Sequence, residues 1–345
     1  MKTRTLLLGT PVLLFLTGAF VGNLYQLDYP GYFPKPYYNF DHNPLSEAKI
    51  TLGRALFYDP ILSKDSSISC ASCHSPYNSF AHTDHELSHG IHDSIGTRNA
   101  PPLFNLAWNS SFMWDGAIPH LDMQPLAPIS HPGEMGEDIA HVVKKLQRKA
   151  IYPGLFRNAY GDSAVTGEHI LKALAQFQLT LVSANSRYDA VKRGEASFSV
   201  QEENGYAIFL TRCNACHTEP LFTNGEFMNN GLPIDTFLND PGRWKITQHP
   251  KDSLSFKVPS LRNLSYTFPY MHDGRFKKLR QVLSHYSDGI EATANLAPQL
   301  REGIQLTPNE KTDLIAFLLT LNDKAFVFNR DYQFPRNLLL PSEGF

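Results

Sequence analysis

All four cysteines of this 345-residue chain lie in two pentapeptides that share one pattern. The first is Cys-Ala-Ser-Cys-His at residues 70–74, and the second is Cys-Asn-Ala-Cys-His at residues 213–217. In each pentapeptide two residues separate the cysteines, and a histidine follows the second cysteine directly. Such a thiol pair can form a disulfide, act as a redox dithiol, supply half of a zinc site or attach a c-type haem.

A c-type haem accounts for every residue of this pattern, because the two thiols form thioethers to the vinyl groups and the histidine ligates the iron. A disulfide leaves the histidines unexplained, and a thioredoxin-like site should lie near a βαβ pattern that is not visible. A zinc site does not explain why a histidine directly follows the second cysteine of each pair. We therefore expect two covalent c-type haems. The residues that would hold them are Cys70, Cys73 and His74 for the first and Cys213, Cys216 and His217 for the second.

The composition is that of a globular protein, with 42% hydrophobic and 19% charged residues. The length allows one large domain or two of ordinary size. The formal net charge is −2, and no lysine- or arginine-rich run stands out. We therefore expect no nucleic acid partner.

Residues 1–24 begin with Lys2 and Arg4 and continue with an apolar run of about 15 residues, a pattern typical of a secretory signal. The run is short for a membrane span of ~20 residues, and Pro11 interrupts it. We expect a cleaved signal, with an uncleaved anchor as the alternative. Either one predicts an exported, periplasmic protein.

A predicted helix precedes each pentapeptide, and another follows some distance later. The first begins near residue 44 and stops at Asp59-Pro60. Strand-like alternation is scarce, and residues 81–99 form a long polar loop rich in histidine. The other helical patterns cover residues 139–149, 169–181, 201–210, 279–286 and 309–321.

These patterns predict a mainly α fold of two c-type cytochrome domains, each carrying one covalent haem, with long loops. The expected N-terminal domain covers residues 40–190 and the C-terminal domain covers residues 198–325. The polar segment 183–199 is expected to link them. The order of helix, haem pentapeptide, loops and helix occurs twice, which indicates a coarse internal duplication.

From about residue 44 to about residue 321, the chain resembles the bacterial di-haem cytochrome c peroxidases and their MauG-type relatives. The resemblance implies peroxide chemistry at the N-terminal haem and electron entry at the C-terminal haem from a small cytochrome c or cupredoxin. It also leaves room for a homodimer. Besides the pentapeptides, the motifs that carry it are LGRALFYDP (52–60), GTRNAP (96–101), WDG (114–116), GEM (133–135), VPSLRN (258–263) and PYMHDG (269–274).

The resemblance also assigns catalytic residues. Glu134 matches the acid/base of the peroxide pocket, Gln124 resembles a second residue of that pocket, and Trp114 matches a tryptophan between the haems. Without the resemblance, Glu134 would be a solvated carboxylate, Gln124 an ordinary loop amide and Trp114 a packing residue. Peroxide chemistry supports the assignment of an acid/base residue, since cleavage of peroxide needs a group that moves a proton between its two oxygens.

A calcium ion between the domains is also implied by the resemblance. Its ligands would be the side chain of Asn99 and the backbone carbonyls of Thr267 and Pro269. Ligation by oxygen atoms alone, completed by water, suits this hard cation. The alternative is a pair of tight loops without a metal.

Two axial positions depart from the best-known peroxidases. Where a histidine of the long loop blocks the N-terminal iron in those proteins, a gapless alignment places Ile91, with His89 and His92 on either side. The distal ligand could thus be absent, His89 or His92.

The second departure is Tyr286, which stands where the peroxidases have a methionine ligand of the C-terminal haem and MauG-type proteins have a tyrosine. Tyrosinate favours ferric iron and lowers the potential. His285 lies next to it as a competing ligand.

Three functions remain open. The first is a peroxidase that reduces hydrogen peroxide with electrons from a small redox protein. The second is a MauG-like oxidase of a protein or a small molecule. The third is a di-haem electron carrier, against which Glu134 and the missing loop ligand argue.

Overall fold

Helices dominate the computed structural model, which describes residues 25–340. Among these residues the strands are two short ones, β1 and β2, which pair antiparallel. The prediction of a mainly α fold is confirmed. The helices and strands are α1 Glu47–Tyr58, α2 Cys70–Cys73, α3 Leu126–Ser130, α4 Ile139–Arg148, α5 Ile151–Tyr160, α6 Gly167–Leu179, α7 Arg187–Lys192, α8 Val200–Arg212, β1 Phe227–Met228, α9 Trp244–Thr247, β2 Phe256–Lys257, α10 Leu279–Asp288, α11 Pro308–Leu319, α12 Lys324–Val327 and α13 Arg336–Leu339.

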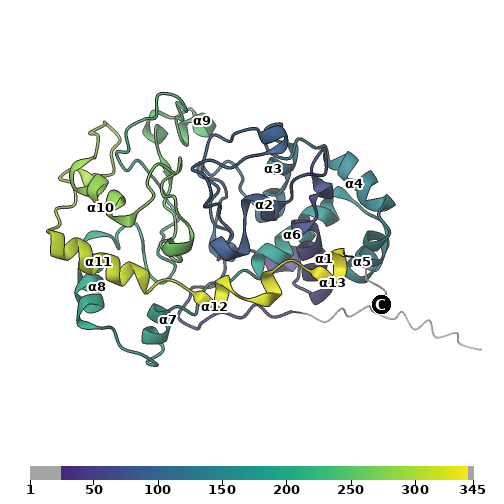
Figure 1. The fold of residues 1–345 in the computed structure, drawn as a ribbon, viewed down its shortest axis with the longest axis horizontal. Coiled ribbons are helices and arrows are strands. Elements are labelled where there is room, and N and C mark those ends of the chain that lie inside the picture. Colours follow the sequence, from purple (N-terminus) through teal and green to yellow (C-terminus); the bar gives the residue numbers. More distant parts are fainter. Residues whose placement is uncertain (1–24, 341–345) are drawn as a thin grey trace, which may run out of the picture.

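The helices gather into two lobes, with α1 to α6 in one and α8, α10 and α11 in the other (Figure 1). The segment that carries α12 and α13 leaves the second lobe and returns to the first. The predicted signal at residues 1–24 lies outside the described residues. None of the described helices is long and apolar enough to cross a membrane.

Each lobe is built on one closely packed helix pair, α1 with α6 and α8 with α11. A glycine lies at each crossing. A Cβ atom on Gly53 would lie 1.9 Å from the carbonyl oxygen of Ala173, and one on Gly205 would lie 2.0 Å from that of Asp313. Because glycine has no Cβ, the backbones can approach this closely.

Serine and threonine side chains fix where these helices begin. Ser46 caps α1 by accepting a hydrogen bond from the Lys49 amide, and Thr166 caps α6 in the same way. Ser199 forms a capping box with Glu202 at the start of α8. Each cap satisfies backbone amides that the first helical turn leaves without partners. The cap of α8 therefore helps to set the position at which this helix delivers the second pentapeptide.

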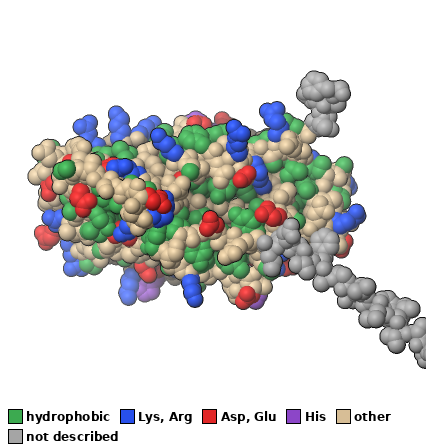
Figure 2. Space-filling model, turned by 90° about the horizontal axis from the view of Figure 1, so that it is seen from below, with side chains coloured by type: hydrophobic (Ala, Val, Ile, Leu, Met, Phe, Trp, Pro, Cys, Tyr) green, Lys and Arg blue, Asp and Glu red, His purple; other side chains and the backbone are tan. Residues whose placement is uncertain are grey.

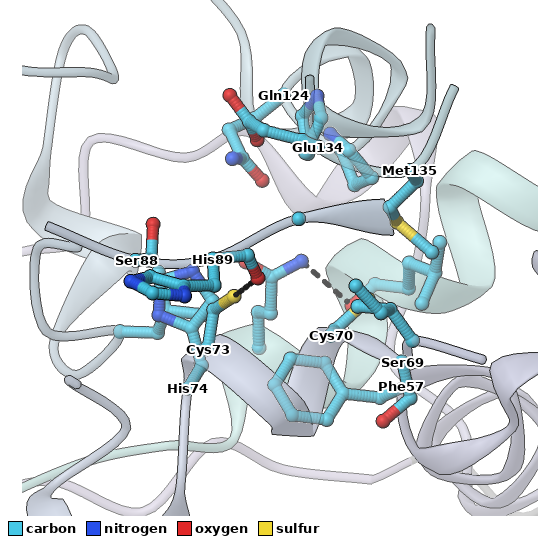
Figure 3. A pocket seen from close by; sticks show the side chains of 17 residues that line it. Phe57, Ser69, Cys70, Cys73, His74, Ser88, His89, Gln124, Glu134 and Met135 are labelled. Carbon is cyan, nitrogen blue, oxygen red and sulfur yellow. Dashed lines mark hydrogen bonds between the residues drawn. The ribbon is translucent and has the colours of Figure 1, made fainter. Parts of the chain in front are cut away.

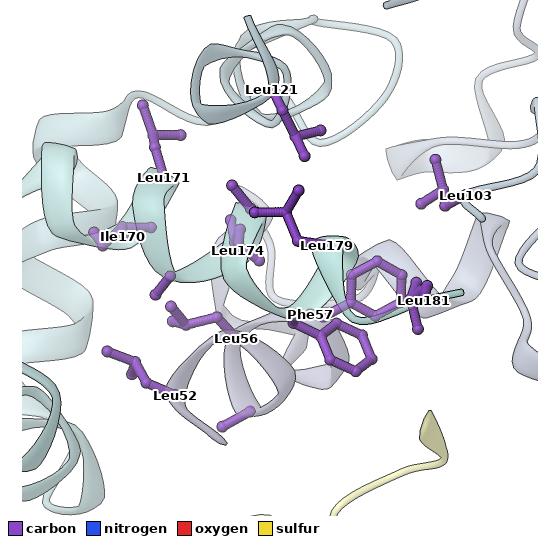
Figure 4. Close-up of a cluster of buried hydrophobic side chains, with 14 of the residues drawn as sticks. Leu52, Leu56, Phe57, Leu103, Leu121, Ile170, Leu171, Leu174, Leu179 and Leu181 are labelled. Carbon is purple, nitrogen blue, oxygen red and sulfur yellow. The ribbon is translucent and has the colours of Figure 1, made fainter. Parts of the chain in front are cut away.

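Two main hydrophobic clusters match the two lobes. The first packs leucine and phenylalanine side chains of α1 and α6 together, including Leu52, Phe57 and Leu174 (Figure 4). The second centres on Phe209 and Phe317, from α8 and α11. The first also takes in side chains of α12. The domain boundaries themselves stay a prediction.

The predicted linker is an integral part of the structure. The segment 183–199 contains α7, and both Tyr188 and Asp189 are fully buried there. Arg262, also fully buried, donates two hydrogen bonds of 2.8 Å to the Asp189 carboxylate. Burial alone would raise the pKa of Asp189, but the hydrogen bonds and charge of Arg262 lower it. This buried ion pair ties the linker to the C-terminal lobe.

Candidate active site

A cavity in the N-terminal lobe brings the first pentapeptide together with the predicted acid. It encloses about 580 Å³ of empty space, including the part that is open to solvent. Figure 3 shows Gln124 and Glu134 on one side of it, opposite Cys70, Cys73 and His74.

His74 is oriented for ligation through Nε2. It follows α2 directly, and its Nδ1 donates a hydrogen bond of 2.8 Å to the carbonyl oxygen of Phe80. Burial lowers the pKa of His74 to about 4, so the ring is neutral at physiological pH. A neutral imidazole held by a backbone carbonyl at one nitrogen is the usual form of a metal-ligating histidine.

The thiols of Cys70 and Cys73 lie at the two ends of α2, and neither is in a disulfide. Burial raises the pKa of Cys70 to about 12 and that of Cys73 to about 11, so both are protonated. Within residues 25–340 no group of three or more His, Cys, Asp or Glu side chains gathers as a metal site. An imidazole, two adjacent thiols and a largely apolar cavity fit a c-type haem.

Gln178 is a further residue of this cavity, and the sequence did not predict it. It lies on α6 and is buried, and its Nε2 donates a weak hydrogen bond of 3.3 Å to the Leu174 carbonyl oxygen. No described residue donates to its Oε1, which is also buried. A buried acceptor without a partner is unfavourable. It therefore indicates that the cavity is built to contain a further group or a water molecule.

Glu134 follows α3 and reaches the cavity with its carboxyl group. The side chain is 41% exposed, and His131 Nδ1 lies 3.6 Å from its Oε1. Burial raises the pKa of Glu134, although the nearby His131 opposes the shift. Gln124 Nε2 has only a weak contact of 3.9 Å with the sulfur of Met113. Both predicted residues thus line the cavity with polar groups that are free to bind a ligand.

Ile91 does not line the cavity, although the alignment places it where other peroxidases carry a blocking histidine. Its amide donates a hydrogen bond of 2.8 Å to the Glu134 carbonyl oxygen, and its buried side chain packs against Gly136. A Cβ atom on Gly90 would lie 1.9 Å from the carbonyl oxygen of Gly133. The histidine-rich loop is thus packed directly against the loop of Glu134.

Of the two flanking histidines, only His89 lines the cavity. Its Nδ1 lies 2.6 Å from a carboxylate oxygen of Asp93, and its ring stacks on that of His85 at 4.6 Å. The side chain of His92 is 74% exposed and lies 4.0 Å from Asp65. The structure therefore leaves His89 as the closer candidate for a loop ligand.

The second pentapeptide has the same proximal arrangement. Cys213 ends α8, and Nδ1 of His217 donates hydrogen bonds to the carbonyl oxygens of Pro259 at 3.0 Å and Phe222 at 3.3 Å. Burial lowers the pKa of His217 to about 4. This ring is also neutral and keeps its Nε2 for iron.

Tyr286 of α10 lies near the two cysteines of this second site. Burial raises the pKa of Tyr286, the hydrogen bond with Asn230 opposes the shift, and the neighbouring Cys213 and Cys216 add to it. The tyrosine hydroxyl accepts a hydrogen bond of 3.4 Å from Asn230. Nε2 of His285 donates to the Asn230 carbonyl oxygen at 3.1 Å and is therefore already engaged. Tyr286 thus lies near the second pentapeptide, and its ligation of the second haem stays a prediction.

Trp114 lies at the junction of the two lobes. Its Nε1 donates a hydrogen bond of 2.8 Å to the carbonyl oxygen of Asn99, and its own carbonyl oxygen accepts one of 2.7 Å from the amide of Lys257. Asn99 precedes it by 15 residues, whereas Lys257 belongs to the C-terminal lobe. Trp114 is thus held between the lobes, and its role between the haems stays a prediction.

An ion-pair network next to Trp114 was also not predicted. Arg98 donates hydrogen bonds to Asp115 at 2.6 Å and to both carboxylate oxygens of Asp240 at 2.5 and 2.9 Å. Asp240 belongs to the C-terminal lobe, so this network connects the lobes. The sequence feature that could have indicated this network is the position of Arg98 within the GTRNAP motif.

Asn99 lies beside the loop that contains the other two predicted calcium ligands. Its amide donates a hydrogen bond of 2.7 Å to the carbonyl oxygen of His272, close in sequence to Thr267 and Pro269. Its Nδ2 donates to the Glu86 carbonyl oxygen at 2.9 Å, which leaves Oδ1 as the oxygen for a cation. Calcium itself stays a prediction.

Comparison with known proteins agrees with this geometry. Residues 47–197 match the family model described as di-haem cytochrome c peroxidase. The methylamine utilization protein MauG of Methylorubrum extorquens is 38% identical over 291 residues, which are 81% of this chain and 79% of that protein. The cytochrome c551 peroxidase of Nitrosomonas europaea is 34% identical over 275 residues, 78% of each chain.

A solved structure extends the likeness to three dimensions. The crystal structure of a MauG-like protein associated with microbial copper homeostasis superposes with a TM-score of 0.82 at 31% identity, over 90% of this chain and 99% of that one. Both lobes are covered by this match. Together with the two haem pentapeptides, these relatives show that the chain belongs to the di-haem cytochrome c peroxidase and MauG family.

Proposed function

We propose that this protein reduces hydrogen peroxide to water with electrons that a small redox protein delivers at the C-terminal haem. The balanced reaction consumes one peroxide, two electrons and two protons and yields two waters. The donor would be a small cytochrome c or a cupredoxin. Relatives named as cytochrome c peroxidases support this function.

The observation that carries the proposal is the placement of Glu134 and Gln124 in the cavity, opposite His74. When bound, the two haems supply an iron site for peroxide and a store for the second electron. Glu134 would take the proton from one peroxide oxygen and return it to the other oxygen as that oxygen leaves. Gln124 orients the peroxide through its amide group.

The environment of Glu134 suits this proton transfer. Burial raises the pKa of the carboxyl above its ordinary value, so that the carboxylate becomes a stronger base. The nearby His131 opposes this shift of the pKa. A group that exchanges a proton readily in both directions is what the reaction needs.

A MauG-like oxidase is the second candidate. The observation that favours it is Tyr286 beside Cys213 and Cys216, since a tyrosine ligand would lower the potential of the second haem. Such a haem would give up electrons to peroxide more easily, and the oxidising equivalents stored in this way would support oxidation of a substrate. The MauG relatives at 38% and 36% identity support this candidate as well.

Steady-state kinetics with hydrogen peroxide and a pre-reduced small cytochrome or cupredoxin would separate the two. A peroxidase should consume peroxide and oxidise the donor continuously, two electrons for each peroxide. Reaction of the protein with peroxide but no sustained oxidation of any donor would contradict the peroxidase and favour the oxidase.

We further propose that the protein is exported and works in the periplasm. The support is the basic start and apolar run of the first 24 residues. Fractionation of cells that express the full chain should recover the haem protein with periplasmic markers. Recovery with cytoplasmic markers would contradict export.

A further inference from the structure

The two lobes repeat one stretch of sequence at their junction. Residues 99–118 and 257–276 align without a gap. Both stretches contain an Asn-Leu pair, and both contain an Asp-Gly pair near their C-terminal ends. The seven identical pairs are Pro101/Pro259, Leu103/Leu261, Asn105/Asn263, Leu106/Leu264, Met113/Met271, Asp115/Asp273 and Gly116/Gly274.

The backbone repeats along with the sequence. Asn105 and Asn263 both have positive φ angles, 55° and 63°, and each opens a short 3₁₀ helix. Met113 and Met271 have φ angles of 70° and 74°, an uncommon conformation for a residue with a side chain. Isolated bridges close both loops in the same register, Phe112 with Ile118 and Tyr270 with Phe276.

The two copies contact each other through reciprocal hydrogen bonds. The amide of Asn99 donates to the carbonyl oxygen of His272, and the amide of Lys257 donates to that of Trp114, each at 2.7 Å. Asn99 aligns with Lys257, and Trp114 aligns with His272. Each copy thus donates to its partner from the same position, as expected for a junction with approximate two-fold symmetry.

The side chains break this symmetry at one pair of positions. Nζ of Lys257 donates a hydrogen bond of 2.8 Å to the carbonyl oxygen of Ser111, and it lies 5.8 Å from the ring centre of Phe112. The corresponding place in the other copy has Asn99 and Pro269, for which the sequence predicts calcium. In one copy this position is therefore occupied by the ammonium group of Lys257. In the other copy the equivalent position has Asn99 and Pro269, the predicted ligands of a calcium ion.

The charge on Lys257 is retained although the side chain is partly buried. Burial lowers the pKa of Lys257 to about 8, while the nearby Asp115 opposes the shift. The ammonium is thus mostly protonated at neutral pH. A charged donor to a backbone carbonyl inside a protein forms a strong hydrogen bond, and removal of the donor leaves the carbonyl without a partner.

We propose that Lys257 is a positioning residue that holds the loop of Trp114 against the C-terminal lobe by a cationic contact with the Ser111 carbonyl. Its amide and its ammonium hold two points of one loop, since they bind the carbonyl oxygens of Trp114 and Ser111. The loop between these points contains Phe112 and Met113. The ammonium does in this copy what a bound cation would do in the other.

Two consequences follow, and they depend on different observations. The first consequence is that the loop is held in place, and this can be tested without any catalytic activity. That the loop holds Trp114 for electron passage between the haems rests on the proposed function. The experiment measures the two separately.

Hydrogen exchange of the haem-loaded protein at neutral pH measures the first consequence. Lys257→Met should speed amide exchange at residues 109–118 by about tenfold or more, and Lys257→Arg should restore most of the protection. Lys251→Met is the matched control, because Lys251 is exposed in the same lobe. It should leave exchange unchanged.

Exchange at residues 109–118 equal to that of Lys251→Met would overturn the proposal. Faster exchange that extends through α8 and α11 would indicate general unfolding and would overturn it as well. Failure of Lys257→Arg to restore protection would overturn the role of the charge.

Single-turnover kinetics measures the second consequence. After peroxide is added to protein reduced at the second haem, electron transfer between the haems should be about tenfold slower in Lys257→Met than in Lys251→Met. An unchanged rate with faster hydrogen exchange would retain the loop contact and refute the link to electron transfer. A protein that does not react with peroxide would refute the proposed function and leave the exchange result valid.

Discussion

Glu134 owes its candidate role to its surroundings more than to its residue type. Glu137 lies three residues after Glu134, but it is bound to Lys145 at 2.9 Å. Burial alone would raise the pKa of Glu137, and the hydrogen bond and charge of Lys145 lower it. Glu134 has only His131 at 3.6 Å and lies at the cavity. A carboxyl group without a strong ion pair can take up and release a proton during a reaction.

Replacement of Glu134 by glutamine removes the proton carrier and keeps the size of the side chain. We expect Glu134→Gln to leave both haem spectra nearly intact and to slow the reaction with peroxide by ~10² or more, the usual size of a lost acid/base. Stopped-flow absorbance measures this rate. Glu203→Gln, an exposed position on α8, is the control and should react like the unmodified protein. An unchanged rate in Glu134→Gln would exclude this residue from the mechanism.

The raised pKa of Glu134 also predicts the direction of the pH dependence. Because burial raises the folded-state pKa, the carboxylate takes up a proton at a higher pH than an exposed glutamate does. The rate of the peroxide reaction should therefore fall as the pH falls through this raised value. In Glu134→Gln this decline should be absent. A decline that persists in the variant would assign the titration to another group.

At the scale of the elements, helices with strong periodicity were predictable and helices with unusual residues were not. The predicted helices at residues 139–149 and 279–286 correspond to α4 and α10 within a few residues. Helix α5 was missed because Pro153 and Gly154 lie in its first turn, where proline is tolerated. Helix α7 was missed because its segment is polar, and its buried partner Arg262 is far away in the sequence.

The two crossings at glycine were not predictable from local sequence, and they provide a sharp test of the helix packing. Gly205→Ala places a Cβ atom 2.0 Å from the Asp313 carbonyl oxygen, so α8 and α11 must move apart. We expect a loss of about 1–3 kcal/mol or more in the free energy of unfolding, as for overpacked cores. Chemical denaturation measures it.

Gly154→Ala is the matched control for this change. Gly154 lies in a helix, and a Cβ atom added there would have no neighbouring atom within 4 Å. Alanine at this position should stabilise the protein by about 0.5–1 kcal/mol, because glycine is the poorer helix former. Equal effects of the two substitutions would contradict the close approach of α8 to α11.

At the scale of the whole molecule, the sequence predicted the parts of the site but not how the lobes join. The pentapeptides, Glu134 and Trp114 were recognisable from local motifs. The contacts of Arg98 with Asp240 and of Lys257 with Ser111 join residues that are far apart in sequence, so no local pattern reveals them. The face in Figure 2 carries charges of both signs spread over its surface, as the small net charge suggests.

Two covalent haems remain the central prediction for the whole molecule. Thioether bonds survive denaturation, so the unfolded protein should keep its haem colour. A pyridine haemochrome assay should give about two haems per chain. Cys213→Ala with Cys216→Ala should reduce this to about one. Extraction of the colour by acid-acetone would contradict covalent attachment.

The state of the oxidised protein depends on how the loop of His89 is packed against that of Glu134. His89 is the loop histidine that lines the cavity, but it is held by Asp93 at 2.6 Å and by stacking on His85. Gly90 leaves no space for movement toward Gly133. To bind iron, His89 would have to give up these contacts.

We therefore expect the fully oxidised protein to have one high-spin haem with an open site and to react with peroxide without prior reduction. Water competes only weakly with peroxide for ferric iron, and Ile91 does not line the cavity, whereas a bound histidine would compete strongly. Electron paramagnetic resonance of the oxidised protein measures this directly, and His89→Ala should leave the high-spin signal unchanged. Two low-spin signals, one of which becomes high-spin in His89→Ala, would show that His89 occupies the site and that reduction of the other haem is needed to release it.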